Sequence, residues 1–238
     1  MSDIRIGILG GTFNPIHFGH LRAAEEVREV LGLDRVLFVP SGNPPLKTEG
    51  LADSLHRYEM ARLATAGNRF FEVLDIECAR PGKSYTIDTV KALKERYHDA
   101  QLSFILGIDS FLDLPNWYEP EELVSLVDFT VMSRPGALFA DLLTSPYLAP
   151  DRKCLEDLDA GEVLSCRFAL RSSKAAVLAR VTPMAISSTD IRRRARQGLT
   201  IKYLLPEDVE SFIISNRLFS TEEDAENQDR KRGYFLKK

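Results

Sequence analysis

The chain has 238 residues, of which 44% are hydrophobic, so it can bury one sizeable core in a single domain or in two small ones. Its formal net charge of −4 and its pI near 5.7 argue against a nucleic acid as the main partner, because attraction to phosphates over a whole surface needs the opposite sign. No apolar run approaches the ~20 residues that span a bilayer, and the start MSDIRIGIL lacks the regions of a signal peptide, so a soluble, cytoplasmic protein without a membrane partner is expected.

The cysteines are Cys78, Cys154 and Cys166, an odd number at wide spacings and without a CxxC pair. This usage is typical of a reducing compartment. It predicts that neither a disulfide framework nor a cysteine-only zinc site organises the fold.

Short apolar runs alternate with longer amphipathic segments over residues 1–135. The short runs predict strands at 4–9, 35–39, 70–76, 102–106 and 129–132. The amphipathic segments predict helices at 21–31, 54–66 and 87–97, and a loop rich in Pro and Gly fills 41–49. Strands separated by helices of about 10–15 residues indicate βαβ crossovers. The expected fold class is therefore α/β, with a doubly wound, Rossmann-like parallel sheet and helices on both faces.

The second half of the chain is less regular in pattern. Residues 136–175 hold several polar and proline positions and are interpreted as a variable, loop-rich segment. A last strand at 176–181 is followed by two helices, which form a C-terminal helical segment. Residues 220–238 carry acids first and bases last, which is typical of a solvated, flexible tail. The expected organisation is one domain over 1–219 followed by this tail.

A glycine-rich stretch, GGTFNPIHFGH, follows the first predicted strand directly. Gly10 and Gly11 let the backbone come close to a ligand, because no Cβ stands in the way. A helix that begins near Gly19 directs its free N–H groups and the positive end of its dipole to the same place, which suits an anion, and His17 and His20 add two imidazoles on one helical face. The stretch predicts a phosphate site. A Gly-Gly pair alone is usually a turn, and two histidines three apart can also bind zinc, but no third ligand occurs at matching spacing.

A second anion site is predicted by the segment ISSTDIR. Ser187, Ser188 and Thr189 precede an Arg-rich helix, so their hydroxyls and N–H groups can meet an anion at a helix start. Arg192 lies on the first turns of this helix and can clamp a phosphate. The alternative is an ordinary Ser/Thr cap followed by a solvated charge run. That alternative is favoured for the other arginines of the helix, Arg193, Arg194 and Arg196.

Three further residues stand where a ligand is expected. Asp109, just past the fourth predicted strand, can accept from ribose hydroxyls or can simply cap the next helix. Lys47, in a proline-stiffened loop, can reach phosphates, although many surface lysines contact nothing. Trp117 is the only tryptophan, and its large ring in a loop must be covered either by the core or by a ligand.

These motifs resemble a known family. GGTFNPIHFGHL is similar to the T/HxGH signature of the nucleotidyltransferase superfamily, and most similar to that of bacterial nicotinate mononucleotide adenylyltransferase. The likeness covers most of residues 4–219. It continues in the same order through PPLK, SYT, LGID, LPNW, SRPG, ISSTDIR and YLLP. The resemblance implies adenylyl transfer from ATP to nicotinate mononucleotide in NAD biosynthesis, giving nicotinate adenine dinucleotide and pyrophosphate, with Mg²⁺ accompanying ATP and no metal site on the protein.

The family pattern implies three groups of site residues. The catalytic contacts fall on His17, His20 and Arg192. The ATP contacts fall on a longer set, Gly10, Gly11, Thr12, Phe13, Lys47, Gly107, Asp109, Ile186, Ser188 and Thr189. The pyridine nucleotide is expected at Ser84, Tyr85, Thr86, Trp117, Tyr118 and Arg134. Within this last set, the resemblance implies that the indole stacks on the pyridine ring and that the backbone N–H groups of Thr86 and Tyr118 meet the nicotinate carboxylate.

The implied reaction needs no protein base, because the attacking 5′-phosphate is already anionic at neutral pH. The chain departs from the family pattern at Asn14, where many members carry aspartate, and at Leu46, which replaces a histidine. Two alternatives stay open: another acceptor, such as phosphopantetheine or a cytidylyl-transfer substrate, and a nucleotide-binding module without turnover. Trp117 together with Ser84, Tyr85 and Thr86 favours a pyridine ring, and the intact T/HxGH signature favours an enzyme.

Overall fold

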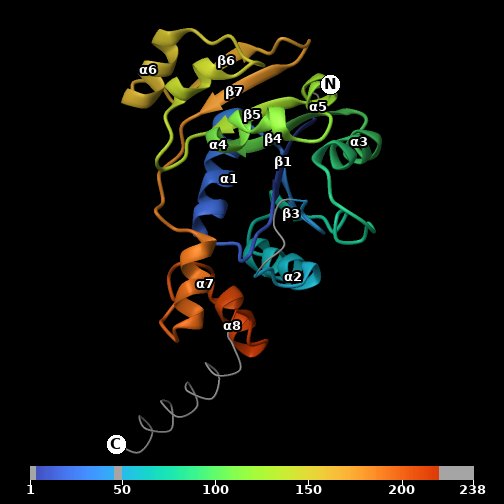
Figure 1. Ribbon diagram of the computed structural model, residues 1–238, viewed down its shortest axis with the longest axis vertical. Helices are drawn as coiled ribbons and strands as arrows, with labels where there is room; N and C mark the ends of the chain where they lie inside the picture. Colours follow the sequence, from blue (N-terminus) through green and yellow to red (C-terminus); the bar gives the residue numbers. More distant parts are fainter. Residues whose placement is uncertain (1–3, 46–49, 220–238) are drawn as a thin grey trace, which may run out of the picture.

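The structure is a computed structural model that describes residues 4–45 and 50–219. The predictions made for Leu46, for Lys47 and for the tail at 220–238 fall on positions outside the described residues. In the described part, one sheet runs through the molecule and helices cover both of its faces (Figure 1).

The sheet has seven strands in the order β3-β2-β1-β4-β5-β7-β6. Their bounds are β1 Ile4–Gly11, β2 Arg35–Pro40, β3 Phe71–Val73, β4 Ala100–Gly107, β5 Asp128–Met132, β6 Ser165–Ala169 and β7 Ala175–Ala179. All neighbours pair parallel except β6, which pairs antiparallel with β7 at one edge. The chain winds outward from β1 to β3 and then outward on the other side from β4, so β1 and β4 are neighbours where the winding reverses. The expected doubly wound α/β fold is confirmed, with one antiparallel edge strand added.

Two apolar cores lie on the two faces of the sheet. Successive strand residues alternate between them: Ile8 belongs to one core and Leu9 to the other. The core that holds Leu9 is covered by α1 (Phe18–Leu31), α2 (Ser54–Thr65) and α8 (Glu207–Ser215). The core that holds Ile8 is covered by α3 (Thr86–Arg96), α5 (Pro120–Leu126) and α6 (Arg152–Ala160). None of the described helices is both long and apolar enough to cross a membrane.

The segment 136–175, expected to be loop-rich, contains regular elements. It holds a 3-10 helix (Phe139–Thr144), then α6, then β6. The side chain of Asp151 caps α6 by accepting from the Cys154 N–H, and α6 ends at Gly161 in the left-handed region with φ 80°. β6 is an edge strand whose residues alternate between half-buried and exposed, so it carries no strong apolar pattern. The expectation of a loop is wrong, because these elements are short and each buries few apolar residues, so their pattern in the sequence is weak.

Cys154 and Cys166 form a disulfide between α6 and β6, and Cys78 is free. The cysteine spacings predicted no disulfide framework, and this one bond was not foreseen. The two cysteines meet because α6 and β6 are consecutive elements that pack together, which the sequence separation of 12 does not reveal. The bond joins two neighbouring elements and leaves the central strands uncrosslinked.

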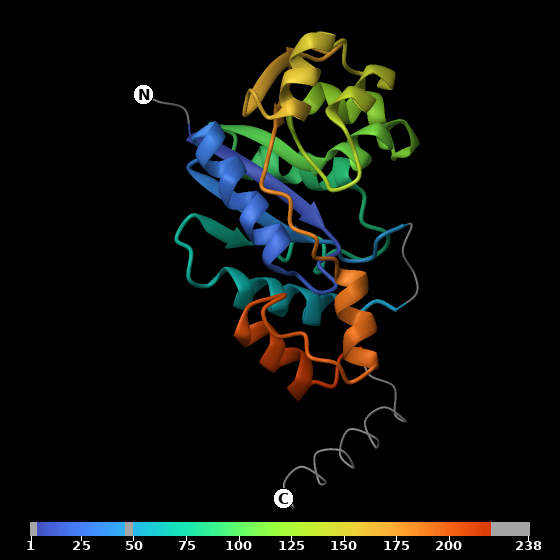
Figure 2. The ribbon, with the colours of Figure 1, turned by 90° about the vertical axis from the view of Figure 1, so that its left-hand side faces the viewer.

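The chain returns from β7 to the glycine-rich stretch before α7 (Ser188–Arg196) begins (Figure 2). On the way, the N–H of Thr182 donates to Glu26 of α1. The hydroxyl of Ser188 then donates to the Pro15 carbonyl at 2.8 Å. These contacts bring the predicted second anion site, more than 170 positions along the chain, against the first.

Candidate active site

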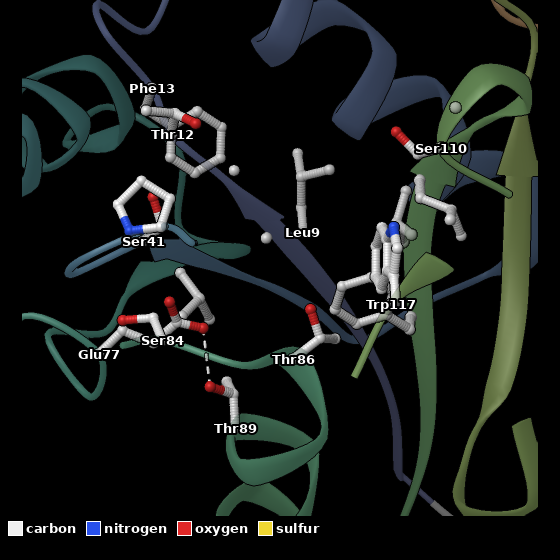
Figure 3. A pocket seen from close by; sticks show the side chains of 18 of the residues that line it. Leu9, Thr12, Phe13, Ser41, Glu77, Ser84, Thr86, Thr89, Ser110 and Trp117 are labelled. Atoms are coloured by element: carbon white, nitrogen blue, oxygen red, sulfur yellow. Dashed lines mark hydrogen bonds between the residues drawn. The ribbon is translucent and has the colours of Figure 1, made fainter. Parts of the chain in front are cut away.

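A cavity of about 1080 Å³ opens where β1 and β4 end (Figure 3). In an open α/β sheet, ligands bind at the carboxyl ends of the strands where the winding reverses. Most of the predicted site residues line it: Gly10, Gly11, Thr12, Phe13, His20, Ser84, Tyr85, Thr86, Gly107, Trp117, Tyr118, Arg134, Ser188, Thr189 and Arg192. The predicted residues His17, Asp109 and Ile186 are described but do not line the cavity.

The glycine-rich turn brings bare backbone to the cavity. A methyl group at Gly11 would lie 3.0 Å from the Phe13 ring, and one at Gly10 would lie 3.3 Å from the Phe104 ring. Phe13 is buried in the left-handed region with φ 45°, a conformation that a bulky residue rarely adopts. Its ring lies edge-on to His20 with centroids 5.2 Å apart. Phe13 therefore supports the imidazole of His20 as well as lining the cavity.

His17 and His20 stack at the start of α1, with ring centroids 3.8 Å apart. The backbone N–H of His17 donates to Nδ1 of His20 at 3.2 Å. Because Nδ1 accepts this bond, the neutral His20 ring carries its proton on Nε2, which makes it a hydrogen-bond donor beside the cavity.

His17 lies behind His20 and is only 4% exposed. Burial, followed by the charge of Arg134, lowers the pKa of His17 to about 4, so this ring is neutral at pH 7. Its Nδ1 atom is buried and has no hydrogen-bond partner within the described part of the chain. The two histidines of the signature thus occupy different places, one at the cavity and one supporting it.

The start of α7 is tied to the glycine-rich stretch. Besides the bond from Ser188 to Pro15, Nη1 of Arg192 donates to the Asn14 carbonyl at 2.8 Å. Burial lowers the pKa of Arg192, and its Nε atom has no hydrogen-bond partner among the described residues. The hydroxyl of Ser188 is therefore engaged by the fold, and Oγ of Ser187 caps the helix by accepting from the Asp190 N–H at 3.1 Å. The backbone N–H groups of Ser188 and Thr189 are the donors of this helix start that a ligand can meet.

Asn14, one of the two departures from the family pattern, is 3% exposed and bonded through both ends of its amide. Its Nδ2 donates to the Gly50 carbonyl at 2.9 Å, and its Oδ1 accepts from the Ala52 N–H at 3.0 Å. An ionised aspartate has no donor for the Gly50 carbonyl. The amide therefore fixes the turn to the segment that precedes α2.

Asp109 lies on the first turn of α4 (Ile108–Leu112), between Gly107 and Ser110, which line the cavity, and so stands at its rim. Its Oδ1 atom is 3.6 Å from Nε of Arg134, and both side chains are largely exposed. Gly107 lies beneath this pair, and a methyl group there would come within 2.5 Å of both side chains. The ion pair bridges the ends of β4 and β5, so a ligand at this rim meets a carboxylate and a guanidinium together.

Aromatic rings gather at the end of the cavity that lies across from the glycine-rich turn (Figure 3). Nε1 of Trp117 donates to Asp113 at 3.3 Å, and the indole meets Phe104 edge-on with centroids 6.3 Å apart. Tyr85 and Tyr118 pair with their ring centroids 4.5 Å apart. Figure 3 shows Trp117 and Thr86 facing the same space. The indole is thus held in one orientation at the wall of the cavity.

Sequence reasoning missed several polar residues at the cavity, among them Glu77, Thr89 and Asp113. It also missed Arg57, which is 1% exposed and lies behind the cavity wall. One signal was available for it. Arg57 occupies the same helical face as the buried Met60, three positions on, and a charged residue in the apolar stripe of a helix marks a special role.

Comparison with known proteins gives a family. A sequence model of the cytidylyltransferase-like family matches residues 8–194. The chain is 45% identical over 219 residues to the probable nicotinate-nucleotide adenylyltransferase of Geobacter sulfurreducens, covering 91% of this chain and 99% of that one. It is 42% identical over 226 residues to the protein of the same name from Thermoanaerobacter sp., covering 93% and 97%.

A solved structure with the same fold is that of Plasmodium falciparum nicotinic acid mononucleotide adenylyltransferase complexed with NaAD. It superposes with a TM-score of 0.68 at 20% identity over 91% of this chain and 97% of that one. The family match, the identity to the relatives and the shared fold agree with the motifs brought together at the cavity. The chain belongs to the cytidylyltransferase-like family and, within it, to the family of the nicotinate-nucleotide adenylyltransferases.

Proposed function

We propose that the chain transfers the adenylyl group of ATP to nicotinate mononucleotide, giving nicotinate adenine dinucleotide and pyrophosphate for NAD biosynthesis. One observation carries the proposal: a single cavity has donors for anions at one end and a fixed indole at the other. A nucleoside triphosphate needs the donors for anions, and a pyridine mononucleotide needs a flat surface for its ring. The names of the relatives support the same reaction.

The phosphates of ATP are assigned to the end formed by the glycine-rich turn. α1 starts soon after the glycine-rich turn and α7 starts at Ser188, which lines the cavity, and anions bind well at such helix starts. His20 donates from Nε2, and Arg192 adds a positive charge. Asp109 at the rim is assigned to the ribose hydroxyls. His17 is assigned a supporting role, because it is buried behind His20.

The pyridine ring is assigned to Trp117, whose flat indole suits a flat partner. Thr86 is the first residue of α3, so its backbone N–H is one of the free donors of a helix start. A carboxylate accepts stronger, charge-assisted bonds from such groups than an amide does. The nicotinate form is therefore the preferred acceptor over the nicotinamide form.

The reaction joins an oxygen of the mononucleotide 5′-phosphate to the α-phosphorus of ATP and breaks the bond between the α-phosphorus and the bridging oxygen, so that pyrophosphate leaves. The attacking oxygen is already anionic, and no proton has to be removed. Catalysis consists of aligning two polyanions and neutralising the charge that develops between them. His20, Arg192 and Arg134 line the cavity and are assigned this neutralising role.

Mg²⁺ belongs to this proposal as part of the substrate MgATP. Among the described residues, no group of three His, Cys, Asp or Glu side chains is arranged to hold a metal ion. The described residues therefore offer no metal site of their own. Mg²⁺ commonly binds through substrate phosphates with few protein ligands, which is compatible with this cavity.

The proposal is tested by pyrophosphate release with MgATP and a panel of acceptors. Nicotinate mononucleotide, nicotinamide mononucleotide and phosphopantetheine are compared by kcat/KM, and CTP replaces ATP in a parallel series. We expect the highest kcat/KM with nicotinate mononucleotide and ATP. A higher value with phosphopantetheine or with CTP would reject the proposal in favour of another nucleotidyltransferase, and no turnover with any pair would indicate a binding module.

A further inference from the structure

The Gly42 peptide lies in the segment after β2, beside the wall of the cavity. It follows Ser41, whose N–H donates to the Gly11 carbonyl at 2.9 Å and which lines the cavity. A methyl group at Gly42 would lie 2.1 Å from the backbone oxygen of Glu77 and 2.9 Å from Oγ of Ser84. The backbone at this point is packed so closely that only glycine fits.

On one side of this peptide lies the buried guanidinium of Arg57. It donates to the carbonyl of Gly42 at 2.8 Å and to the carbonyl of Thr12 at 2.9 Å. It also donates to Oγ of Ser41 at 3.3 Å and to the carbonyl of Ala52 at 3.0 Å. The guanidinium therefore ties the glycine-rich turn, the segment after β2 and the segment before α2 to one point.

On the other side of the peptide lies the carboxyl group of Glu77, which is 8% exposed. The hydroxyl of Thr89 donates to its Oε1 atom at 2.7 Å (Figure 3). The Gly42 N–H and the Ser84 hydroxyl also hydrogen-bond to this carboxyl group, while burial raises its pKa. Thr89 lies in the first turns of α3 and Ser84 lies two residues before that helix, whose start is assigned to the pyridine carboxylate.

Burying the side chains of Arg57 and Glu77 costs free energy, so they are poorly suited to stabilise the fold alone. All four hydrogen bonds of Arg57 go to neutral oxygens. Within the described residues Asp53 and Glu77 act on its charge without a hydrogen bond to the guanidinium. Burying a charge costs several kcal/mol unless it is paired, and well-packed apolar residues are often at least as stabilising. The feature that an apolar side chain cannot reproduce is the set of directed bonds to three backbone segments.

We infer that Arg57 and Glu77 are positioning residues that hold the backbone of Gly42, Arg57 through its carbonyl and Glu77 through its N–H. Together they fix the phosphate-binding turn relative to the pyridine-binding start of α3. This inference rests on the proposed function for the assignment of ATP and the pyridine nucleotide to the two ends of the cavity. The hydrogen bonds of Arg57 and Glu77 to Gly42 are present in the protein without substrates. Two substrates must be aligned closely for phosphoryl transfer, and a displacement of about 1 Å can cost about 10²-fold in rate.

The test uses three variants and two matched controls. Gly42→Ala places a methyl group against the Glu77 backbone. Arg57→Lys keeps the charge but cannot make the forked set of hydrogen bonds. Glu77→Ala removes the carboxyl group that accepts from the Gly42 N–H. Gly67→Ala is the control for glycine, because a methyl group there has no heavy atom within 4 Å. Arg62→Lys is the control for arginine, because Arg62 lies on the exposed side of the same helix.

The first readout is amide hydrogen exchange of the protein without substrates. The Asn43 N–H donates to Oγ of Ser84, and the Ser84 N–H donates to the Asn43 carbonyl, so these two amides report on the wall directly. We expect their exchange to rise at least about tenfold in the three variants while the amides of β1 and β4 stay protected, as local opening predicts. Both controls should exchange as the wild type does.

The second readout is turnover with MgATP and nicotinate mononucleotide. We expect kcat to fall by about 10²-fold in the three variants, since alignment is lost, with no such loss in the controls. If Gly42→Ala does not fold, Arg57→Lys and Glu77→Ala decide. Unchanged exchange and turnover in those two variants would overturn the inference, and so would losses that only follow global unfolding. If the wild-type protein transferred no adenylyl group while the variants still showed the expected rise in exchange, the proposed function would be rejected and the positioning role of Arg57 and Glu77 would stand.

Discussion

Replacing Trp117 by Ala removes the flat surface assigned to the pyridine ring. In the structure the indole is held by the bond from its Nε1 to Asp113 at 3.3 Å and by its edge contact with Phe104. A ring that is already ordered loses little conformational freedom when a ligand stacks on it, so most of the stacking energy should appear as affinity. Removing an aromatic stacking partner costs about 1–3 kcal/mol, which corresponds to a rise of about 5- to 150-fold in KM for nicotinate mononucleotide.

The assay varies one substrate at a time in steady-state pyrophosphate release. KM for ATP should stay close to the wild-type value in Trp117→Ala, because the residues assigned to ATP lie at the other end of the cavity. Trp117→Phe keeps a flat ring and should give a much smaller rise than Trp117→Ala. A change confined to ATP, or equal changes for both substrates, would refute the assignment of the indole to the pyridine ring.

The other predictions concern the phosphate end, the pH response and the outlying parts of the chain. His20→Ala and His17→Ala should each lower kcat by about 10²-fold or more with little change in folding, since one removes a donor and the other its support, and near-normal rates would reject the phosphate assignment. Because the pKa of His17 is lowered from 6.5 to about 4, the unfolded state takes up the proton first: the free energy of unfolding should be unaffected by this group above pH 6.5 and fall by about 3 kcal/mol as pH drops from 6.5 toward 4. Urea unfolding at several pH values should show that the free energy of unfolding depends less on pH in His17→Gln than in the wild type. An equal dependence on pH in the two proteins would contradict the cause given for the pKa shift. Replacing Cys154 and Cys166 by Ser should leave kcat and both KM values unchanged while costing about 2–4 kcal/mol of stability at most, and lost turnover would show that α6 and β6 reach the site. Removal of residues 220–238 should leave turnover intact, and a loss would show that the tail contributes to the enzyme.

Much of the fold followed from the period of the apolar residues. The strands at β1, β2, β4 and β5 are buried on both faces, and their continuous apolar runs stand out in the sequence. β3 is confirmed but covers only Phe71–Val73, because the rest of the predicted run continues outside the sheet. β6 is half-exposed at an edge and was missed, since only an interior strand must be apolar throughout.

The cavity was predictable where motifs carry backbone geometry, as at Gly10 and Gly11. Contacts between distant segments were beyond reach. Nothing near Asn14 in the sequence shows that its amide bonds Gly50 and Ala52, or that Arg192 donates to its carbonyl. The separate places of His17 and His20 also needed the structure, because their spacing of three does not show that His17 is buried while His20 lines the cavity.

The path of the adenylyl group tests the central claim most directly. ATP labelled at its α-phosphorus is incubated with the protein, Mg²⁺ and nicotinate mononucleotide, and the products are separated. The label should appear in nicotinate adenine dinucleotide, with one pyrophosphate released for each dinucleotide formed. Label recovered only in free AMP, or phosphate transferred to the acceptor from γ-labelled ATP instead, would contradict adenylyl transfer by this cavity.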